Sequence, residues 1–196
     1  FCYFGPLGGT ASVSIPFSVD EPCGPPLIAA YDEGRDGTSV ALPPSAIGGT
    51  APDHVVNGSF PLGQHALVVT AGDACGNSAD LTIPFSVVDC KPPSVICVNG
   101  LSVNIQPNGS VSMFYTDFLL DSSDNITPPG ELVHSLRRGE GPSTFPLDIN
   151  GAPIHEIQFG CDDIGMQPVQ LWARDAAGNA DYCETYVLVQ DNQGGC

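Results

Sequence analysis

The chain has 196 residues, which is enough for one large domain or for two domains of about 100 residues each. It carries 22 acidic and 5 basic residues and a net charge of −17, so it lacks the cations that bind nucleic-acid phosphates or anionic membranes. No apolar run reaches the roughly 18 residues of a membrane-spanning helix. The hydrophobic fraction of 42% is spread along the chain and predicts a folded protein with a buried core.

Short strands separated by tight turns are predicted along the whole chain. Polar and apolar residues alternate, with many Val, Ile, Thr, Phe and Tyr, at 12–15, 65–70, 101–105, 169–173 and 185–189. Turn dipeptides that accept positive φ stand between such runs, at 36–37, 57–58, 99–100, 108–109 and 150–151. One short helical turn is expected at 115–120, with Thr116 as its cap. The pattern predicts an all-β chain of sandwich type.

Internal repetition is the strongest signal in the sequence. Residues 14–20 recur with little change at 82–89, sharing the core Ile-Pro-Phe-Ser-Val, and a looser copy stands at 185–191. The segment Asp-Ala-Cys-Gly-Asn at 73–77 matches Asp-Ala-Ala-Gly-Asn at 175–179, and each follows an alternating strand. We therefore expect a closing hairpin made of a strand, an Asp-x-x-Gly-Asn turn and a second strand to occur twice.

This repetition predicts two tandem domains at 21–89 and 90–191. Residues 1–20 are then an extra N-terminal strand, which is either the end of a preceding repeat or a strand donated to a neighbouring subunit. Residues 192–196 are the start of a linker or of a next repeat. In the alternative interpretation, the strand at 11–19 is simply the first strand of the first domain.

These motifs resemble the hyalin repeat (HYR) and related bacterial immunoglobulin-like repeats. The second domain carries the resemblance in Pro-Pro-Ser-Val-Ile-Cys at 92–97 and in the segment 175–189. The first domain is similar through 56–63 and 73–87. The resemblance implies two immunoglobulin-like β-sandwiches of a kind that occurs in tandem in large secreted or cell-surface proteins, including adhesins.

Eight cysteines at wide spacings indicate disulfides formed in an oxidising, extracellular compartment. The family pattern implies the pair Cys97–Cys183, which joins an early strand to the last strand. Cys23 and Cys75 are the two cysteines inside the first domain, and we expect them to pair. Some of the remaining four are expected to link neighbouring repeats or subunits; they are Cys2, Cys90, Cys161 and Cys196.

Calcium is the one cofactor for which the sequence offers ligands. Aspartates recur at the domain junctions and at the closing turns, and calcium prefers carboxylate and carbonyl oxygens. The candidates are Asp20, Asp73, Asp89, Asp175 and Asp191. An Asp-x-x-Gly-Asn sequence is also a good turn without any metal, because Asp bonds the backbone and Gly takes positive φ.

Catalytic motifs for acyl transfer, zinc hydrolysis and phosphate binding are missing from the sequence, so we expect no enzyme. Three glycosylation triplets begin at Asn57, Asn108 and Asn125. The single Trp172, next to Leu171, is expected to mark the core of the second domain.

The sequence thus predicts an extracellular structural module of a surface protein or filament. Its repeats or subunits are joined head to tail by strand addition and disulfides, with copies of itself or neighbouring repeats as partners. One alternative is an adhesin module that binds glycans or a host surface. The other is an accessory domain of a secreted hydrolase.

Overall fold

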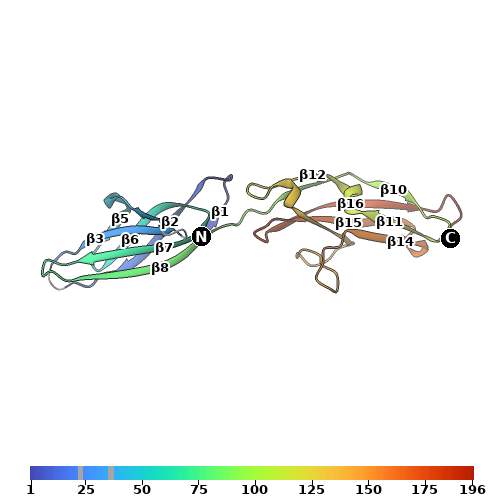
Figure 1. Ribbon diagram of the computed structural model, residues 1–196. Coiled ribbons are helices and arrows are strands. Elements are labelled where there is room, and N and C mark those ends of the chain that lie inside the picture. Colours follow the sequence, from blue (N-terminus) through green and yellow to red (C-terminus); the bar gives the residue numbers. More distant parts are fainter. Residues whose placement is uncertain (22–23, 35–37) are drawn as a thin grey trace. The chain divides into compact units, whose positions relative to one another are not determined.

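The computed structural model describes residues 1–21, 24–34 and 38–196, and it divides into two compact units. Unit 1 is Phe1–Cys90 and unit 2 is Lys91–Cys196 (Figure 1). Each unit is an all-β sandwich, which confirms the predicted fold class. The boundary expected between residues 89 and 90 lies one residue later.

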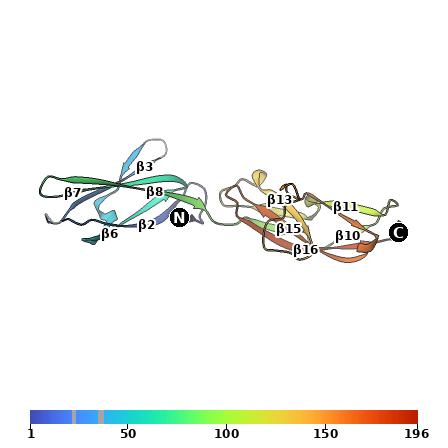
Figure 2. The ribbon, with the colours of Figure 1, turned by 90° about the horizontal axis from the view of Figure 1, so that it is seen from below.

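Unit 1 consists of a five-stranded and a three-stranded sheet, with the strand orders β1-β8-β7-β3-β4 and β2-β6-β5. Figure 2 shows β7 and β8 in one layer and β2 and β6 in the other. The elements are β1 (Cys2–Tyr3), β2 (Thr10–Ser18), β3 (Leu27–Gly34), β4 (Ser39–Ala41), the 3-10 turn Pro44–Ala46, β5 (Ile47–Thr50), β6 (Asp53–Pro61), β7 (Gly63–Gly72) and β8 (Ser78–Asp89).

The alternating sequence of β2 explains its place in the sandwich. Successive side chains of a strand point to opposite faces, and in β2 every second residue is buried. Val13, Ile15 and Phe17 are buried in this way, and so are Phe60 of β6 and Leu67 of β7. The strand pairs with β6 along its whole length, from Thr10 opposite Pro61 to Ser18 opposite Asp53. It is therefore an integral part of unit 1.

Unit 2 has one four-stranded sheet, β10-β16-β15-β13, and two strand pairs, β11-β14 and β12-β9. The strands are β9 (Ser94–Cys97), β10 (Leu101–Asn104), β11 (Ser110–Phe114), β12 (Leu119–Ser123), β13 (Val133–Arg138), β14 (Glu156–Gly160), β15 (Gly165–Arg174) and β16 (Ala180–Gln190). The helical turn α1 (Tyr115–Phe118) and the 3-10 turns Pro129–Glu131 and Cys161–Asp163 connect them.

The core of unit 2 lies on one face of the four-stranded sheet. It includes Leu136 of β13, Leu171 of β15 and Val187 of β16, all fully buried. Trp172 is also buried, but it points to the opposite face, where the Arg137 guanidinium lies 5.2 Å from its ring centre. Residues 142–146 reach over that face, because the Pro146 carbonyl accepts a hydrogen bond from the Ser135 hydroxyl. The expectation that Trp172 is a buried core residue is confirmed.

The two units share one arrangement of strands around their closing hairpins. The hairpins β7–β8 and β15–β16 are antiparallel, and a short parallel strand pairs with the last strand of each, β1 with β8 and β10 with β16. The N-terminal segment therefore occupies in unit 1 the place that β10 occupies in unit 2. The prediction that residues 1–20 end a preceding repeat is corrected by this pairing within unit 1, whereas their donation to a neighbouring subunit stays a prediction. The alternative, a first strand of the first domain, agrees with the structure.

The C-terminal residues 192–196 also belong to a unit. They lie in unit 2, and Cys196 forms a disulfide with Cys161 of the same unit. The prediction that they begin a linker or a next repeat is corrected by this bond.

The two copies of the Ile-Pro-Phe-Ser-Val sequence both form strands, but these strands do not occupy equivalent places in the sheets. Its first copy is in β2 of the three-stranded sheet, and its second is in β8 of the five-stranded sheet. Pro16 and Pro84 are exposed at the middle of the motif in both strands. Proline has no N–H for a sheet ladder, so it is restricted to edges and similar places in strands.

Three turn predictions are confirmed and one is wrong. Gly100, Gly109 and Gly151 have φ of 79° to 80° at the predicted turns. Asn57–Gly58 lies inside β6, where a Cβ on Gly58 would come within 2.5 Å of the Phe60 ring. The dipeptide at 36–37 lies outside the described residues. The helical turn at 115–118 is confirmed, but its cap is the Asp117 carboxylate, which accepts from the Phe114 N–H at 2.8 Å, and not Thr116.

Candidate functional site

The closing turns of the two units have the same pattern of hydrogen bonds. In unit 1, the two carboxylate oxygens of Asp73 accept hydrogen bonds from the backbone N–H and the side-chain amide of Asn77, both at 2.7 Å. In unit 2, Asp175 accepts the same two bonds from Asn179 at 2.8 Å. The side-chain bond from Asn77, followed by the backbone bonds, lowers the pKa of Asp73. The repeated motif is thus a self-sufficient turn in both units.

The turn in unit 2 is the more deeply buried of the two. Asp175 is 4% exposed, and the Thr127 hydroxyl accepts a hydrogen bond from the Ala176 N–H at 3.1 Å. A carboxylate oxygen of Asp124 lies within 4.8 Å of one of Asp175. The Asp124 Oδ2 accepts hydrogen bonds from the N–H groups of Ile126 and Thr127 at 2.9 and 2.8 Å. Sequence reasoning missed the contact between these turns, because the spacing of the residues does not show it.

The five predicted calcium ligands are not gathered into one site within either unit. Asp175 and Asp191 flank the 11-residue strand β16, which separates them by about 35 Å. The Asp191 carboxylate accepts from the N–H groups of Gly195 and Cys196 at 2.7 and 3.1 Å. Asp20 follows the end of β2 and is exposed, whereas Asp89 ends β8 and is buried. Calcium binding by these aspartates stays a prediction.

The disulfides confirm one predicted cysteine pair and correct the prediction that other cysteines link neighbouring repeats or subunits. Cys97 is bonded to Cys183, as the family pattern implies. Cys2 is bonded to Cys90 within unit 1, and Cys161 to Cys196 within unit 2. These four cysteines therefore do not link neighbouring repeats or subunits, because tertiary contacts bring their sulfurs together inside each unit.

The predicted pair Cys23–Cys75 is tested only in part. Cys75 is disulfide-bonded, and Cys23 lies outside the described residues.

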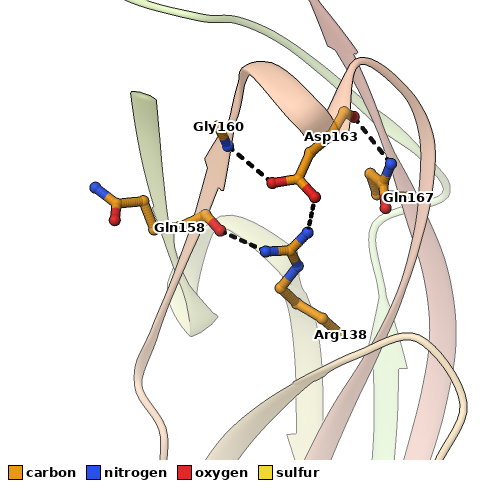
Figure 3. Close-up of polar contacts among 5 residues, drawn as sticks. All are labelled: Arg138, Gln158, Gly160, Asp163 and Gln167. Carbon is orange, nitrogen blue, oxygen red and sulfur yellow. Dashed lines mark hydrogen bonds and ion pairs between the residues drawn. The ribbon is translucent and has the colours of Figure 1, made fainter. Parts of the chain in front are cut away.

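A polar network holds the segment that carries Cys161 (Figure 3). The Asp163 carboxylate pairs with the Arg138 guanidinium and accepts from the Gly160 N–H at 2.8 Å. Arg138 also donates to the Gln158 carbonyl at 2.8 Å, and the Gln167 amide donates to the Asp163 carbonyl at 2.9 Å. The Gly160 bond, and after it the Arg138 partner, hold the pKa of Asp163 below its usual value. This carboxylate therefore stays ionised and stabilises the turn that precedes β15.

The geometry of His65 argues against a catalytic role. Its Nδ1 lies 2.8 Å from the Asp32 carboxylate, an arrangement that resembles a catalytic dyad. Its Nε2, however, lies 2.9 Å from the Pro61 carbonyl oxygen. The ring stacks on Phe85, with centres 5.0 Å apart. Both ring nitrogens are engaged within the fold, so neither is open to a substrate.

A second histidine packs in an aromatic cluster of unit 2. The Tyr115 ring stacks on His134, with centres 5.2 Å apart, and lies 5.3 Å from the ring of His155. The His134 Nε2 lies 3.0 Å from the Ser122 hydroxyl. Burial, and secondarily the charge of His155, lower the pKa of His134.

One exposed apolar stripe crosses the outer face of β15 and β16. Met166 stands directly opposite Leu188, and their exposed fractions are 66% and 37%. Tyr186 follows on the same face of β16. Beyond the polar pair of Gln170 and Glu184, Tyr182 stacks on Trp172 with ring centres 4.5 Å apart. Sequence reasoning did not predict this surface. The sequence feature that could have predicted it is the alternation of side chains along β16, which places these residues on one face of the sheet.

The three glycosylation triplets differ in accessibility. Asn57 in β6 and Asn108 in a turn are exposed. Asn125 is half-buried, and the Thr127 of its triplet is 4% exposed. Glycosylation at Asn57 and Asn108 stays a prediction, whereas the fold disfavours it at Asn125.

Comparison with known proteins supports the repeat-type fold. No family model matches the chain. The chain is 25% identical over 144 residues to hyalin of Strongylocentrotus purpuratus. The alignment covers 62% of the chain and 12% of hyalin. The chain therefore spans about an eighth of that protein.

The solved structures give the same result for the fold. A three-domain structure of titin domains I67–I69, an E-to-A mutated variant, matches 96% of the chain and 61% of its own length, with a TM-score of 0.51 and 14% identity. This likeness shows a tandem immunoglobulin-like fold. Among the described residues, no helix is long and apolar enough to cross a membrane.

Proposed function

We propose that this chain is a non-catalytic structural module of an extracellular surface protein or filament, in which such repeats follow one another head to tail. The disulfides carry the proposal. Among the described residues there is one disulfide within unit 1 and there are two within unit 2. Disulfide bonds persist in oxidising compartments outside the cytosol. The likeness to a small part of hyalin supports a place within a longer protein.

The polar side chains support a structural role. Asp73 and Asp175 close turns, His65 has both nitrogens engaged, and Asp163 fixes a turn beside a disulfide. Each of these groups stabilises its own unit. Neighbouring repeats and copies of the same chain are the proposed partners.

Differential alkylation on intact source cells tests this proposal. A thiol reagent that cannot cross membranes is applied before and after a reductant of the same kind, and labelled cysteines are read by mass spectrometry. We expect the cysteines to be labelled only after reduction and without lysis. Labelling that requires lysis, or that occurs before reduction, contradicts an extracellular module.

The second candidate function is binding of glycans by unit 2. The observation that favours it is the exposed stripe with Tyr182 and Tyr186, beside the polar Gln170 and Glu184. Tyrosine rings present an apolar face together with a polar tip, which suits a ligand that has both kinds of surface.

A glycan array with the wild type and the double variant Tyr182→Ala, Tyr186→Ala tests it. We expect binding that the double variant loses and that Tyr31→Ala in unit 1 retains. Absence of wild-type binding, or equal binding by the double variant, removes this candidate.

A further inference from the structure

The ends of unit 1 are joined by a covalent bond. The Cys2–Cys90 disulfide connects residues 88 positions apart, and unit 1 runs from Phe1 to Cys90. The Cα atoms of the two cysteines are 5.3 Å apart. A pull that enters at residue 1 and leaves at residue 91 therefore passes through this bond, and the sandwich between the two cysteines is outside the path of tension.

Backbone hydrogen bonds hold the two ends of unit 1 together next to the Cys2–Cys90 disulfide. Strand β1 runs parallel to the end of β8, with Cys2 opposite Val88. The Val88 N–H donates to the Phe1 carbonyl at 2.9 Å, and the Cys90 N–H to the Tyr3 carbonyl at 3.1 Å. The two ends of the unit are thus already side by side before any force acts on the disulfide.

Unit 2 has a similar short path through its disulfides. Cys97 lies near its start and is bonded to Cys183, 86 positions later. Tension that enters at Lys91 passes along 91–97, through this bond, and then along 183–196. The segment 98–182, which contains β10 to β15, is outside that path.

The Cys161–Cys196 bond supports the C-terminal end of the path. It ties Cys196 to the turn that the Arg138–Asp163 pair holds. A pull on residue 196 therefore also acts on the folded body of unit 2, until the non-covalent contacts of that body yield. The covalent path through 183–196 is shorter than the one through 161–183, so it sets the limit of extension.

We propose that the oxidised chain works as a nearly inextensible tether. Only about 75 Å of backbone lies in the path of tension, against on the order of 700 Å for the fully reduced chain, at about 3.6 Å per residue. Hydrogen bonds and packing contacts are far weaker than covalent bonds, so a unit without its disulfide unfolds under a force that the covalent path withstands. This property goes beyond the proposed function, because it rests on the disulfide connectivity alone.

Single-molecule force spectroscopy tests the proposal on the full chain. The chain is fused between two handle domains that attach next to residues 1 and 196. For the oxidised wild type, we expect no length gain above about 70 Å.

A dithiol reductant provides the comparison. Each disulfide takes two electrons and two protons and becomes two thiols, while the dithiol closes to its own disulfide. After reduction, we expect steps of roughly 300 to 350 Å from each unit. A step of that size in the oxidised wild type overturns the proposal, and so does an unchanged trace after complete reduction.

Two matched double variants assign the steps to the units under oxidising conditions. In Cys2→Ser, Cys90→Ser, unit 1 should add a step of about 100 to 300 Å, depending on the loop that the Cys75 disulfide closes. In Cys97→Ser, Cys183→Ser, unit 2 should add about 200 Å or more, because Cys161–Cys196 still bridges its end. If neither variant lengthens the trace, the assigned path is wrong.

The alkylation experiment on cells reads location and redox state, whereas the pulling experiment reads connectivity. Failure of one is therefore distinguishable from failure of the other.

Discussion

His134 shows how burial acts on a single titratable side chain. It lies on β13 under the Tyr115 ring, and burial lowers its pKa, with a smaller contribution from His155. A lowered pKa in the folded state means that the unfolded chain binds the proton more readily. The stability contribution of neutral His134 is therefore complete above the ordinary value of 6.5 and is lost as pH falls through that value toward the lowered pKa.

The matched variants His134→Gln and His155→Gln test this residue. We expect urea unfolding of unit 2 to show falling stability from pH 7.5 to 5 in the wild type. The slope should nearly vanish in His134→Gln and shrink less in His155→Gln, because repulsion by His155 is the smaller cause. Equal slopes in the wild type and His134→Gln would contradict the assignment.

At the scale of elements, the two closing turns are built alike in different surroundings. Gly76 and Gly178 have φ of 91° and 98°, a region that other residues rarely adopt. A Cβ at either position would meet nothing within 4 Å. The cost of a side chain there is therefore conformational strain alone.

The substitutions Gly76→Ala and Gly178→Ala should each lower the free energy of unfolding by about 1 to 2 kcal/mol. Gly130→Ala is the control, because Gly130 has an ordinary φ and equally open surroundings, and it should cost nothing. Chemical denaturation measures all three. A cost at Gly130 equal to that at the two turns would show that conformational strain is not the cause.

The N-terminal strands form a second element-scale case. Removal of residues 1–20 takes β1 and β2 from unit 1, and with them the buried side chains Val13, Ile15 and Phe17. Each such side chain stabilises a fold by about 1.5 to 3 kcal/mol, against a total stability of about 5 to 15 kcal/mol.

The truncated chain, with Cys90→Ser, should therefore lose unit 1 and keep unit 2. Amide hydrogen exchange should show β6 and β7 unprotected and β15 and β16 protected. The full-length Cys2→Ser, Cys90→Ser chain is the control and should keep both units protected. Protection of β6 in the truncated chain would support the donated-strand hypothesis instead.

At the scale of the whole molecule, the net charge of −17 opposes compaction. Only four of the five basic residues lie in the described part, and the three arginines among them pack on aromatic rings of unit 2. Salt screens such repulsion, because the Debye length falls from about 30 Å at 0.01 M to about 10 Å at 0.1 M.

We expect the melting temperature to rise by a few degrees between about 0.01 and 0.3 M sodium chloride. Calcium chloride at matched ionic strength separates screening from the predicted metal binding, with magnesium chloride as control. A rise specific to calcium supports the aspartate ligands, and equal rises indicate screening alone. A melting temperature that falls with salt would contradict the repulsion argument.

The sequence by itself determined the all-β class, the closing turns at 73–77 and 175–179, and the helical turn at 115–118. These features follow from period-two alternation and from local turn chemistry, which act over a few residues. The Cys97–Cys183 pair came from the family resemblance.

Only the tertiary structure decided where the strands pair. The same five-residue motif stands in β2 and β8 and enters different sheets, because the register with distant partners fixes a strand's place. The bonds Cys2–Cys90 and Cys161–Cys196 depend on the same long-range pairing, since a cysteine bonds to the one that the fold brings within reach. The paths along which this chain carries tension were therefore absent from the sequence pattern and appear only in the folded units.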